Sequence, residues 1–370
     1  MGTKWCKTVI GGGILLAAAV FPIIFLCQEK ENVQHKPGVS PDDSPLYSFV
    51  SRHLMSDDGG VYTNLRTDLL KQPDTARNHD QLSESTGLLM EYALLSQKKD
   101  LFDHQVYFLD KNLVSSKKWV KWMVGDEKKG PPVNASIDDL RIAHALIQAG
   151  QKWGNPEYKK LGMSVAEGLI QGNASGPYLA DYYNWEDKKK GDKLTSSYLD
   201  LKAMRLLAEE KPADWKKVYE SSRTLLQEAQ LPSGLYRKTY KLDSKQWLPD
   251  GQGYNLIDSL LAALHASEDG LSVEPTLSFL HKAWNKDGVL YGTYKEDGQT
   301  LTENESPAVY AIAVRLLRLQ QDPLAEELQK RMGQLSVQDS NSPYYGGFLD
   351  TNTLECYSFD QLQALLVERQ

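Results

Sequence analysis

The feature that most constrains the fold is a unit that recurs along the chain. Each unit contains a short segment with glycine and aromatic residues, a polar turn, an apolar amphipathic helix and a second, more charged helix. Such helices pair through their apolar faces and keep the charged face in water. Six pairs predict an all-α fold, an (α/α)6 barrel with an inner and an outer ring of helices. The inner helices are predicted to begin near Ser83, Ser136, Ser196, Tyr254, Glu305 and Cys356, and the outer helices to cover residues 45–56, 100–113, 155–170, 212–229, 272–284 and 322–335.

Short β-hairpins are predicted at the entrances of several inner helices. Residues 234–251 and 288–299 alternate aromatic and polar side chains around Asp-Ser and Asp-Gly turns. We expect these hairpins to lie together at one mouth of the barrel. Aromatic rings there have two interpretations, as lids on the barrel core or as platforms on which sugar rings stack. The residues concerned are Tyr182, Tyr183, Trp185, Tyr236, Tyr240, Trp247, Tyr291, Tyr294, Tyr344 and Tyr345.

The N-terminus carries a separate signal. Lys4 and Lys7 precede a nearly continuous apolar run of about 20 residues, which is long enough to cross a bilayer as a helix. We expect an uncleaved anchor, with lipidation of Cys27 as the alternative, and the lysines orient the rest of the chain to the outside of the cell membrane. The predicted parts are a cytoplasmic N-terminus (residues 1–7), a transmembrane anchor or signal (8–27), a flexible spacer (28–44) and one globular domain (45–370).

Charge and composition exclude several kinds of partner. The formal net charge is -7 and no positive stripe is present, so nucleic acid is not an expected partner. The seven histidines lack the spacing of metal ligands, and there is no glycine-rich phosphate loop. Cys356 is the one cysteine of the globular part, so no disulfide can form within it. We expect a monomer without metal or organic cofactor.

Carboxylates stand at the entrances of two inner helices. Glu84 lies in the first turn of its predicted helix, and Leu88 and Tyr92 follow on the same face, so the carboxyl group shares the apolar side. Asp138 and Asp139 open the next inner helix, and the pattern places Asp139 on its inward side. An acidic residue in a first turn is also an ordinary helix cap. For Glu84 to act as an acid near neutral pH its pKa must rise by about two units, roughly 2.7 kcal/mol.

These residues resemble motifs of glycoside hydrolase family 8, and the similarity runs from about Gly59 to the C-terminus. The segment LSESTGLLMEYAL resembles the entry to the helix that carries the proton donor, which places the donor at Glu84. ASIDDLRIA resembles the signature Ala-Thr-Asp-x-Asp-Leu-x-Ile-Ala, with Asp139 at its second aspartate and Ile137 at its first. Ser197 and Tyr198 resemble a third motif, Pro-Ser-Tyr.

The chain departs from the family pattern at the general base. Many members have Tyr-Asp at the fourth inner helix, where this chain has Tyr254 followed by Asn255, which cannot accept a proton. A branch of the family is similar in having asparagine there, with the base in the preceding loop. In this chain that loop offers Asp243, which we favour because it lies at a predicted hairpin tip, and Asp250 as the alternative. Both aspartates are also good turn formers.

The resemblance implies an inverting hydrolase without cofactor. Glu84 would protonate the departing oxygen while a carboxylate on the other side activates water, which requires carboxyl groups roughly 6.5–9.5 Å apart. Asp139 would bind sugar hydroxyl groups, and Tyr198 would orient the water or the base. The full set of expected substrate-binding residues is Asp138, Asp139, Trp185, Tyr198, Tyr254 and Asn255.

The expected substrate is a polysaccharide, cleaved internally at β-linkages. A tethered enzyme cannot diffuse towards distant polymers, so the cell's own exopolysaccharide or biofilm matrix is the favoured substrate. Two alternatives remain. Asn255 and Ile137 would also suit a catalytically inactive polysaccharide-binding barrel, and a helical-repeat scaffold would present an open concave array instead of a closed ring.

Overall fold

The computed structural model describes residues 37–72, 75–116 and 118–369. Its inner helices are α3 (Ser83–Leu95), α5 (Ser136–Trp153), α7 (Leu201–Glu210), α9 (Leu256–Glu268), α11 (Pro307–Leu319) and α13 (Ser358–Val367). Its outer helices are α2 (Pro45–Phe49), α4 (Lys99–Phe108), α6 (Pro156–Gly172), α8 (Pro212–Ala229), α10 (Glu274–Asp287) and α12 (Leu324–Gln334). Each inner and outer helix expected from the repeat is present.

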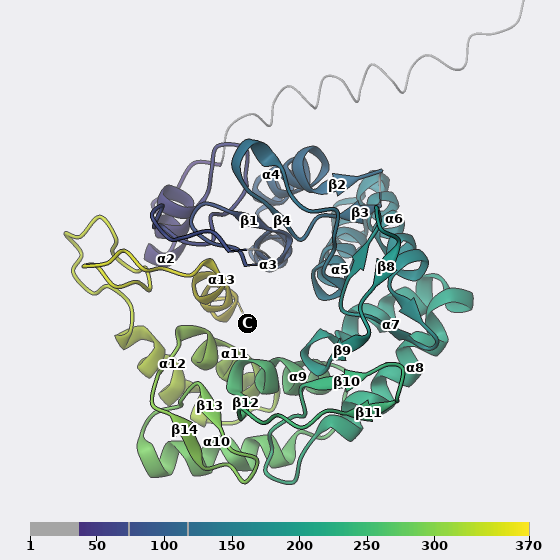
Figure 1. The fold of residues 1–370 in the computed structure, drawn as a ribbon. Coiled ribbons are helices and arrows are strands. Elements are labelled where there is room, and N and C mark those ends of the chain that lie inside the picture. The colour runs from purple at the N-terminus through teal and green to yellow at the C-terminus, as the bar shows by residue number, and fades with distance from the viewer. Residues whose placement is uncertain (1–36, 73–74, 117, 370) are drawn as a thin grey trace, which may run out of the picture. The chain divides into compact units, whose positions relative to one another are not determined.

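The inner helices form a closed ring. Each contacts the next along the series α3, α5, α7, α9, α11 and α13, and α13 returns to contact α3 (Figure 1). The outer helices surround them, and α5 with α6, α7 with α8 and α11 with α12 form tightly packed hairpins. The predicted (α/α)6 barrel is therefore confirmed, and the open array of a scaffold is excluded for this part of the chain.

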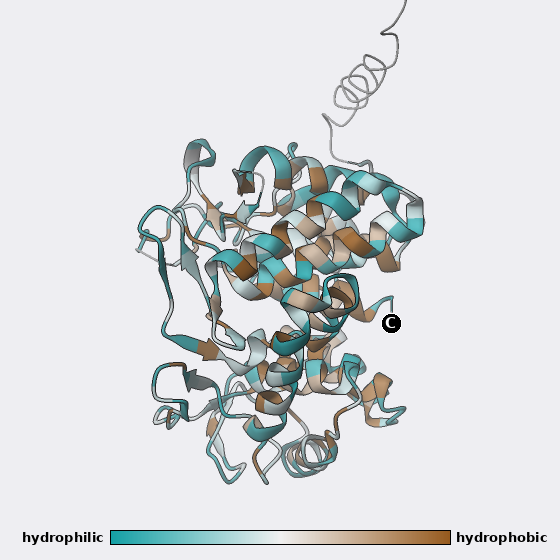
Figure 2. Ribbon diagram, turned by 90° about the vertical axis from the view of Figure 1, so that its right-hand side faces the viewer, coloured by the Kyte–Doolittle hydropathy of each residue, from teal (hydrophilic) through white to brown (hydrophobic). Residues whose placement is uncertain are grey.

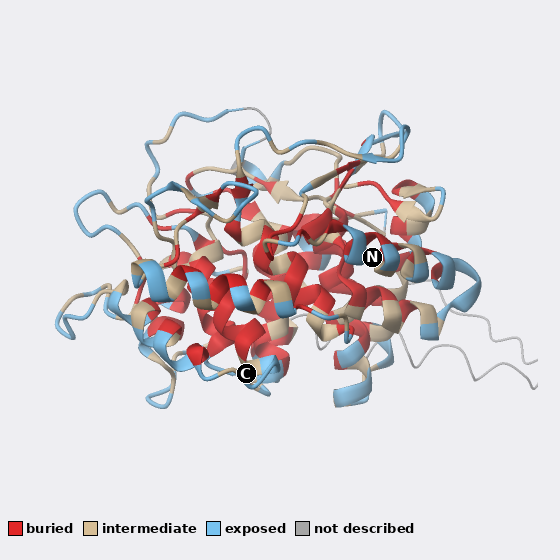
Figure 3. Cartoon of the chain, turned by 90° about the horizontal axis from the view of Figure 1, so that it is seen from below, coloured by how far each residue is buried: buried red, intermediate tan, exposed pale blue. Residues whose placement is uncertain are grey.

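The inner helices are more apolar than the outer helices because they are buried on more sides. In α11 every residue from Ala308 to Leu317 is buried, because this helix is covered by its inner neighbours and by α12. Outer helices alternate polar and apolar faces (Figure 2), and the buried residues gather in the helical layer (Figure 3). Small residues allow close approach: a Cβ atom on Gly162 of α6 would lie 2.9 Å from the carbonyl oxygen of Ala143.

Short antiparallel strands gather on one side of the helical layer (Figure 3). They pair as β1 (Gln81–Leu82) with β4 (Met123–Val124), β2 (Val114–Ser115) with β3 (Trp119–Val120), β5 (Ala174–Ser175) with β6 (Tyr178–Leu179), and β7 (Tyr183–Asn184) with β8 (Lys189–Lys190). Two three-stranded sheets have the orders β11 (Gln246–Trp247), β10 (Thr239–Lys241), β9 (Lys193–Thr195) and β12 (Tyr254–Asn255), β13 (Thr293–Tyr294), β14 (Thr300–Thr302). Both predicted hairpins are present.

Four predicted helix starts were wrong by a few residues. The third inner helix begins at Leu201 because the Asp200 side chain caps it, accepting a hydrogen bond from Ala203 N at 2.9 Å, and residues 196–198 form a separate 3-10 turn. The fourth begins at Leu256, since the two residues before it are paired in β12. The fifth and sixth begin two residues later than expected, at Pro307 and Ser358.

The N-terminal predictions fall mostly outside the described residues. Residues 8–27, the expected anchor, and residues 28–36 of the expected spacer are not described. Among the described ranges no helix combines the length and apolar character that a membrane crossing requires. The end of the expected spacer contacts the barrel, because Asp43 forms an ion pair with Lys98 at 2.5 Å and Ser44 donates a hydrogen bond to Glu368 at 2.7 Å.

One buried carboxylate joins three helices of the barrel and gives a test of its stability. Asp269, just after α9, accepts hydrogen bonds from Arg205 of α7 at 2.8 Å and from Arg223 of α8 at 2.9 Å, and Tyr219 of α8 also donates to it. Asp269→Ala is expected to lower the free energy of unfolding by about 3 kcal/mol. This is the low end of the range for a broken buried ion pair, because both arginines are partly exposed to solvent. Urea denaturation measures the loss.

The matched control removes a single hydrogen bond from the same cluster. Tyr219→Phe keeps the ring and both ion pairs of Asp269, so it should cost only about 1 kcal/mol. Equal losses for the two variants would contradict the assignment of Asp269 as the group that joins these helices.

Candidate active site

Glu84 is placed by the junction between a short strand and an inner helix. Leu82 has an extended conformation and ends β1, and Ser83 begins α3 with its N–H donating to the carbonyl of Trp122 at 3.0 Å. The pairing of β1 with β4 therefore fixes the first turn of α3. Ser83 and Ser85 are buried on either side, whereas Glu84 is half-buried at the strand side of the barrel.

Asp138 of α5 is the acidic neighbour of Glu84. Its carboxylate accepts hydrogen bonds from Ser83 Oγ at 2.7 Å and from the Glu84 backbone N–H, and it pairs with Arg141 at 3.3 Å. Burial, and next the negative charge of Asp138, raise the pKa of Glu84 to about 7 against the opposing charge of Arg141. Glu84 therefore keeps its proton close to neutral pH, which a catalytic acid requires.

Asp139 lies in a different environment from the one expected. It is buried, and its carboxylate accepts a hydrogen bond from Asn134 Nδ2 at 2.8 Å, while the same amide nitrogen donates to Asn173. Consecutive helix residues point about 100° apart, so Asp138 and Asp139 cannot both face Glu84. Burial raises the pKa of Asp139 well above its usual value. The structure thus brings Asp138, and not the neighbouring Asp139 that matches the second aspartate of the family signature, beside Glu84.

Tyr198 lies among several carboxylates. Burial raises its pKa, and the charges of Asp138, Asp181, Glu84 and Asp258 add to the effect. The phenol therefore stays protonated at neutral pH and can donate a hydrogen bond. The structure places Tyr198 close enough to Glu84 for the two groups to interact electrostatically.

Asp181 and Asp258 were missed by the sequence reasoning. Asp181 accepts hydrogen bonds from Thr195 N at 2.7 Å and Thr195 Oγ1 at 2.8 Å, and burial raises its pKa to about 6. Asp258, in the first turn of α9, accepts from Ser197 Oγ at 3.0 Å and pairs with Lys238 Nζ at 2.7 Å. The available signal was the position of Asp258 at the entrance of an inner helix, like that of Glu84.

The two aspartates expected as the base occupy different sites. Asp243 lies in the exposed turn between β10 and β11, where 66% of its side chain is exposed and Lys241 is 3.7 Å away. Asp250 lies at the end of the same hairpin and accepts a hydrogen bond from Lys238 N at 3.1 Å. Burial raises the pKa of Asp250, and the charges of Asp258 and Glu296 raise it further. Asp250 therefore belongs to the carboxylate cluster that Lys238 and Asp258 share.

The remaining predicted substrate-binding residues are Tyr254, Asn255 and Trp185, and they differ in how far their side chains are exposed. Tyr254 is buried and donates a hydrogen bond to Glu296 at 3.0 Å, which leaves little of its ring for a sugar. Asn255 is exposed, and its side chain caps α9 by accepting from Asp258 N at 3.2 Å. Trp185 is half-buried and stacks on Trp119, with ring centroids 6.3 Å apart and an interplanar angle of 9°.

The structure divides the aromatic residues into a buried and a more exposed group. Tyr236, Tyr240 and Tyr294 are buried and act as lids on the core. Tyr182 is exposed and Trp185 half-buried, so their rings are open to solvent on the side of the molecule that carries the strands.

The comparisons with known proteins identify the family of this chain. The family model for glycosyl hydrolases family 8 matches residues 48–247, which include Glu84, Asp138 and Tyr198. A protein of Bacillus subtilis strain 168, described as the putative lipoprotein YdaJ, is 30% identical over 351 residues, 93% of this chain and 92% of that protein.

Solved structures share the fold over most of the chain. One described as a novel alpha-amylase from Clostridium perfringens is 28% identical with a TM-score of 0.81, covering 88% of this chain and 95% of the other. PssZ from Listeria monocytogenes is 23% identical with a TM-score of 0.72, covering 91% and 98%. Because the family model covers more than half of the chain, this protein belongs to glycosyl hydrolases family 8 and is an inverting glycoside hydrolase.

Proposed function

We propose that this protein hydrolyses a polysaccharide outside the cell, with Glu84 as the general acid and Asp250 as the general base. The observation that carries the proposal is the position of Glu84 beside Asp138, where burial and the charge of Asp138 raise the pKa of Glu84 to about 7. A carboxylic acid with that pKa keeps its proton up to about neutral pH and can still release it to a glycosidic oxygen.

The reaction is a single displacement with inversion. Water attacks the anomeric carbon, the bond from that carbon to the glycosidic oxygen breaks, Glu84 gives its proton to the departing oxygen and the base takes a proton from the water. Asp250 suits the base because one of its oxygens accepts a hydrogen bond from Lys238 N and its raised pKa makes it a better proton acceptor than an exposed aspartate. Asp243 is less suitable, since its exposed side chain lies in a hairpin turn.

Other residues of the cluster orient the reactants. Tyr198 would donate a hydrogen bond to the attacking water or to a carboxylate, because burial and the surrounding negative charge keep its hydroxyl group protonated. Asp258 is occupied by Ser197 and Lys238 and would hold the far wall of the site in place. Asp138 would contact the substrate beside Glu84, while Asp139 would support the wall through Asn134.

The favoured substrate is the cell's own exopolysaccharide or biofilm matrix, cut within the chain at β-linkages. Solved structures of 17–18% identity described as endo-glucanases, from Vibrio fischeri and Acetobacter xylinum, share the fold. Tethering through residues 8–27 or through a lipid on Cys27 is supported by the description of the Bacillus relative as a putative lipoprotein. Fractionation of cells, with and without Cys27→Ser, tests the lipid anchor.

A second linkage type has its own support. The Clostridium structure is described as an alpha-amylase and is 28% identical, more than the endo-glucanases, so an α-glucan is the competing substrate. Incubation with β-glucan, xylan, chitosan, amylose and purified matrix, followed by assay of new reducing ends, distinguishes them. Because inversion changes the anomeric configuration, NMR of fresh product should show the α-anomer from a β-linkage and the β-anomer from an α-linkage.

Trp185 gives a prediction about substrate binding. Its ring is held parallel to Trp119, and a sugar stacked on the open face would gain about 1 kcal/mol. Trp185→Ala is therefore expected to raise KM for a long substrate by roughly fivefold to tenfold, with kcat little changed. Initial rates across substrate concentrations measure the effect. As a control, Trp284→Phe on the outer helix α10 should leave KM unchanged, and an unaltered KM in Trp185→Ala would count against the platform.

A further inference from the structure

A buried arginine reaches Asp138, the carboxylate beside Glu84, from inside the barrel. Arg141 lies one turn after Asp138 on α5, and only 9% of it is exposed. Its Nη1 is 3.3 Å from Asp138 Oδ1, while Asp138 Oδ2 accepts the hydrogen bond from Ser83. Together with the Glu84 N–H, three donors from α3 and α5 fix this one carboxylate.

Gly87 provides the space for this arrangement. A Cβ atom on Gly87 would lie 3.1 Å from Arg141 Cδ and 3.4 Å from Arg141 Cγ, so the arginine stem crosses α3 directly over the glycine. Gly87 is one turn after Glu84 on the same helix. The glycine in the Glu84 motif therefore also determines where the Arg141 side chain can run.

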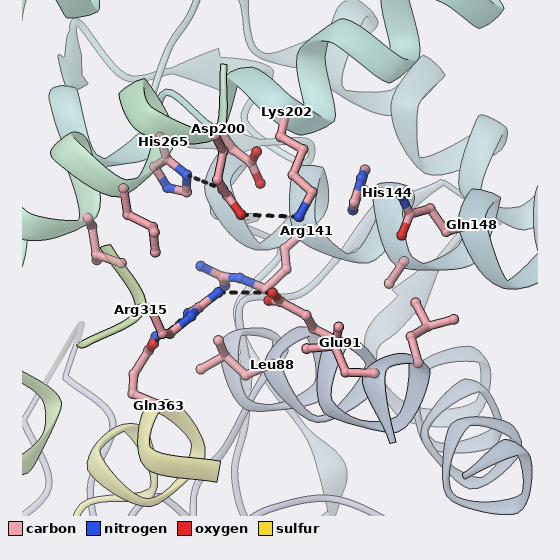
Figure 4. Close-up of a pocket in the computed structure, with 16 residues that line it drawn as sticks. Leu88, Glu91, Arg141, His144, Gln148, Asp200, Lys202, His265, Arg315 and Gln363 are labelled. Carbon is pink, nitrogen blue, oxygen red and sulfur yellow. Dashed lines mark hydrogen bonds and ion pairs between the residues drawn. The ribbon is translucent and has the colours of Figure 1, made fainter. Parts of the chain in front are cut away.

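Arg141 also lines a partly open cavity of about 80 Å³ between the inner helices (Figure 4). Two other ion pairs line this cavity, Glu91 with Arg315 at 3.0 Å and Glu268 with Lys202 at 3.1 Å. Arg141 differs from Lys202 and Arg315 because its ion pair is with a carboxylate of the catalytic cluster.

We infer that Arg141 is a positioning residue, which holds Asp138 against Glu84 and sets the pH at which the catalytic acid loses its proton. The inference rests on the proposed role of Glu84. Arg141 stands at a position that the family signature leaves open, and its neighbours in the structure give it this role through Asp138.

Electrostatics give the direction of the effect. The charge of Arg141 lowers the pKa of Glu84 and is the largest influence that lowers the pKa of Asp138, against the burial that raises both. Removing this cation therefore raises the pKa values of Glu84 and Asp138. Glu84 then stays protonated to a higher pH, and it donates its proton to the glycosidic oxygen less readily. The other ionisable groups facing this region are Tyr198 and, around the cavity, Glu91, His144, Asp200, Lys202, His265, Glu268 and Arg315.

The test measures kcat and KM across pH for Arg141→Met, Arg141→Lys and Gly87→Ala. Arg141→Met should lower kcat at neutral pH by about tenfold and move the alkaline limb of the kcat profile to higher pH, with a smaller change in KM. Arg141→Lys should return the limb towards that of the wild type. Gly87→Ala, which leaves every charge in place and presses on the arginine stem, should move the limb in the same direction as Arg141→Met.

Arg315→Met is the matched control, because it removes a buried cation of the same cavity that is paired with Glu91 instead of Asp138. It should lower stability and leave the limb in place. The inference would be overturned if the alkaline limb of the kcat profile of Arg141→Met stayed where it is in the wild type, or if Arg315→Met moved it equally far. If Arg141→Met does not fold, Gly87→Ala decides by the same readout. Activity retained by Glu84→Gln would instead reject the proposed acid.

Discussion

Glu84→Gln is expected to lower kcat by roughly 10²–10⁴-fold on a polysaccharide substrate, the range that general acid catalysis supplies. The amide has the shape of the carboxylic acid and no proton to release. Since the wild-type group is neutral when it acts as the acid, a neutral amide beside Asp138 should preserve the fold and the binding of glycan. Reducing-end assays and calorimetric titration with oligosaccharide measure the two properties separately.

The matched control for this variant lies two turns further along the same helix. Glu91 belongs to α3, pairs with Arg315 and faces the axial cavity, so Glu91→Gln changes the same functional group on the same helix away from the reaction. Its kcat should stay close to that of the wild type. Hydrolysis by Glu84→Gln within tenfold of the wild-type rate would contradict the assignment of the acid.

The leaving group gives a second readout for the same residue. A dinitrophenolate leaving group departs without being protonated. Glu84→Gln should therefore hydrolyse a dinitrophenyl glycoside with much less loss of rate than a polysaccharide. The wild-type kcat should fall as pH rises through about 7, because Glu84 must be protonated to act, and this alkaline limb should be absent from the Gln variant. A limb that persists in Glu84→Gln would assign it to another group.

The ring of helices was predictable because its signal is local and repeated. Each inner helix carries its own apolar face, and six copies of one unit leave closure as the way to bury them all. Helix starts were less accurate, since strands such as β12 hold the preceding residues extended through partners distant in sequence. Placing Glu84 at a helix entrance needed only the order of residues within one turn.

The rest of the site depends on contacts that no local pattern reports. Whether Asp138 or Asp139 faces Glu84 depends on the rotation of α5 about its axis, which packing against α3 and α6 sets. Asp258 is joined to Ser197 across 61 positions of the sequence, so its part in the cluster appears only in the folded chain. The proposed role of Arg141 on α5 is equally hidden in the sequence, because it depends on the position of Glu84 on the neighbouring helix α3.

The second large effect is expected at the general base. Asp250→Ala should lower kcat by roughly 10²–10⁴-fold, and added azide should restore turnover by attacking the anomeric carbon in place of activated water. The product would be a glycosyl azide of inverted configuration, which NMR identifies. Asp243→Ala, in the exposed turn of the same hairpin, should keep most of its activity.

Asp258 is the most informative comparison with Asp250, because both carboxylates are held by Lys238, one through its ammonium group and the other through its backbone N–H. Asp258→Ala should lose activity through disorder of Ser197 and Lys238, and azide should not restore it. Rescue of Asp258→Ala alone would make Asp258 the base and Asp250 its support. Rescue of Asp243→Ala alone would mean that the hairpin closes over the substrate during the reaction, bringing its exposed turn to the anomeric carbon.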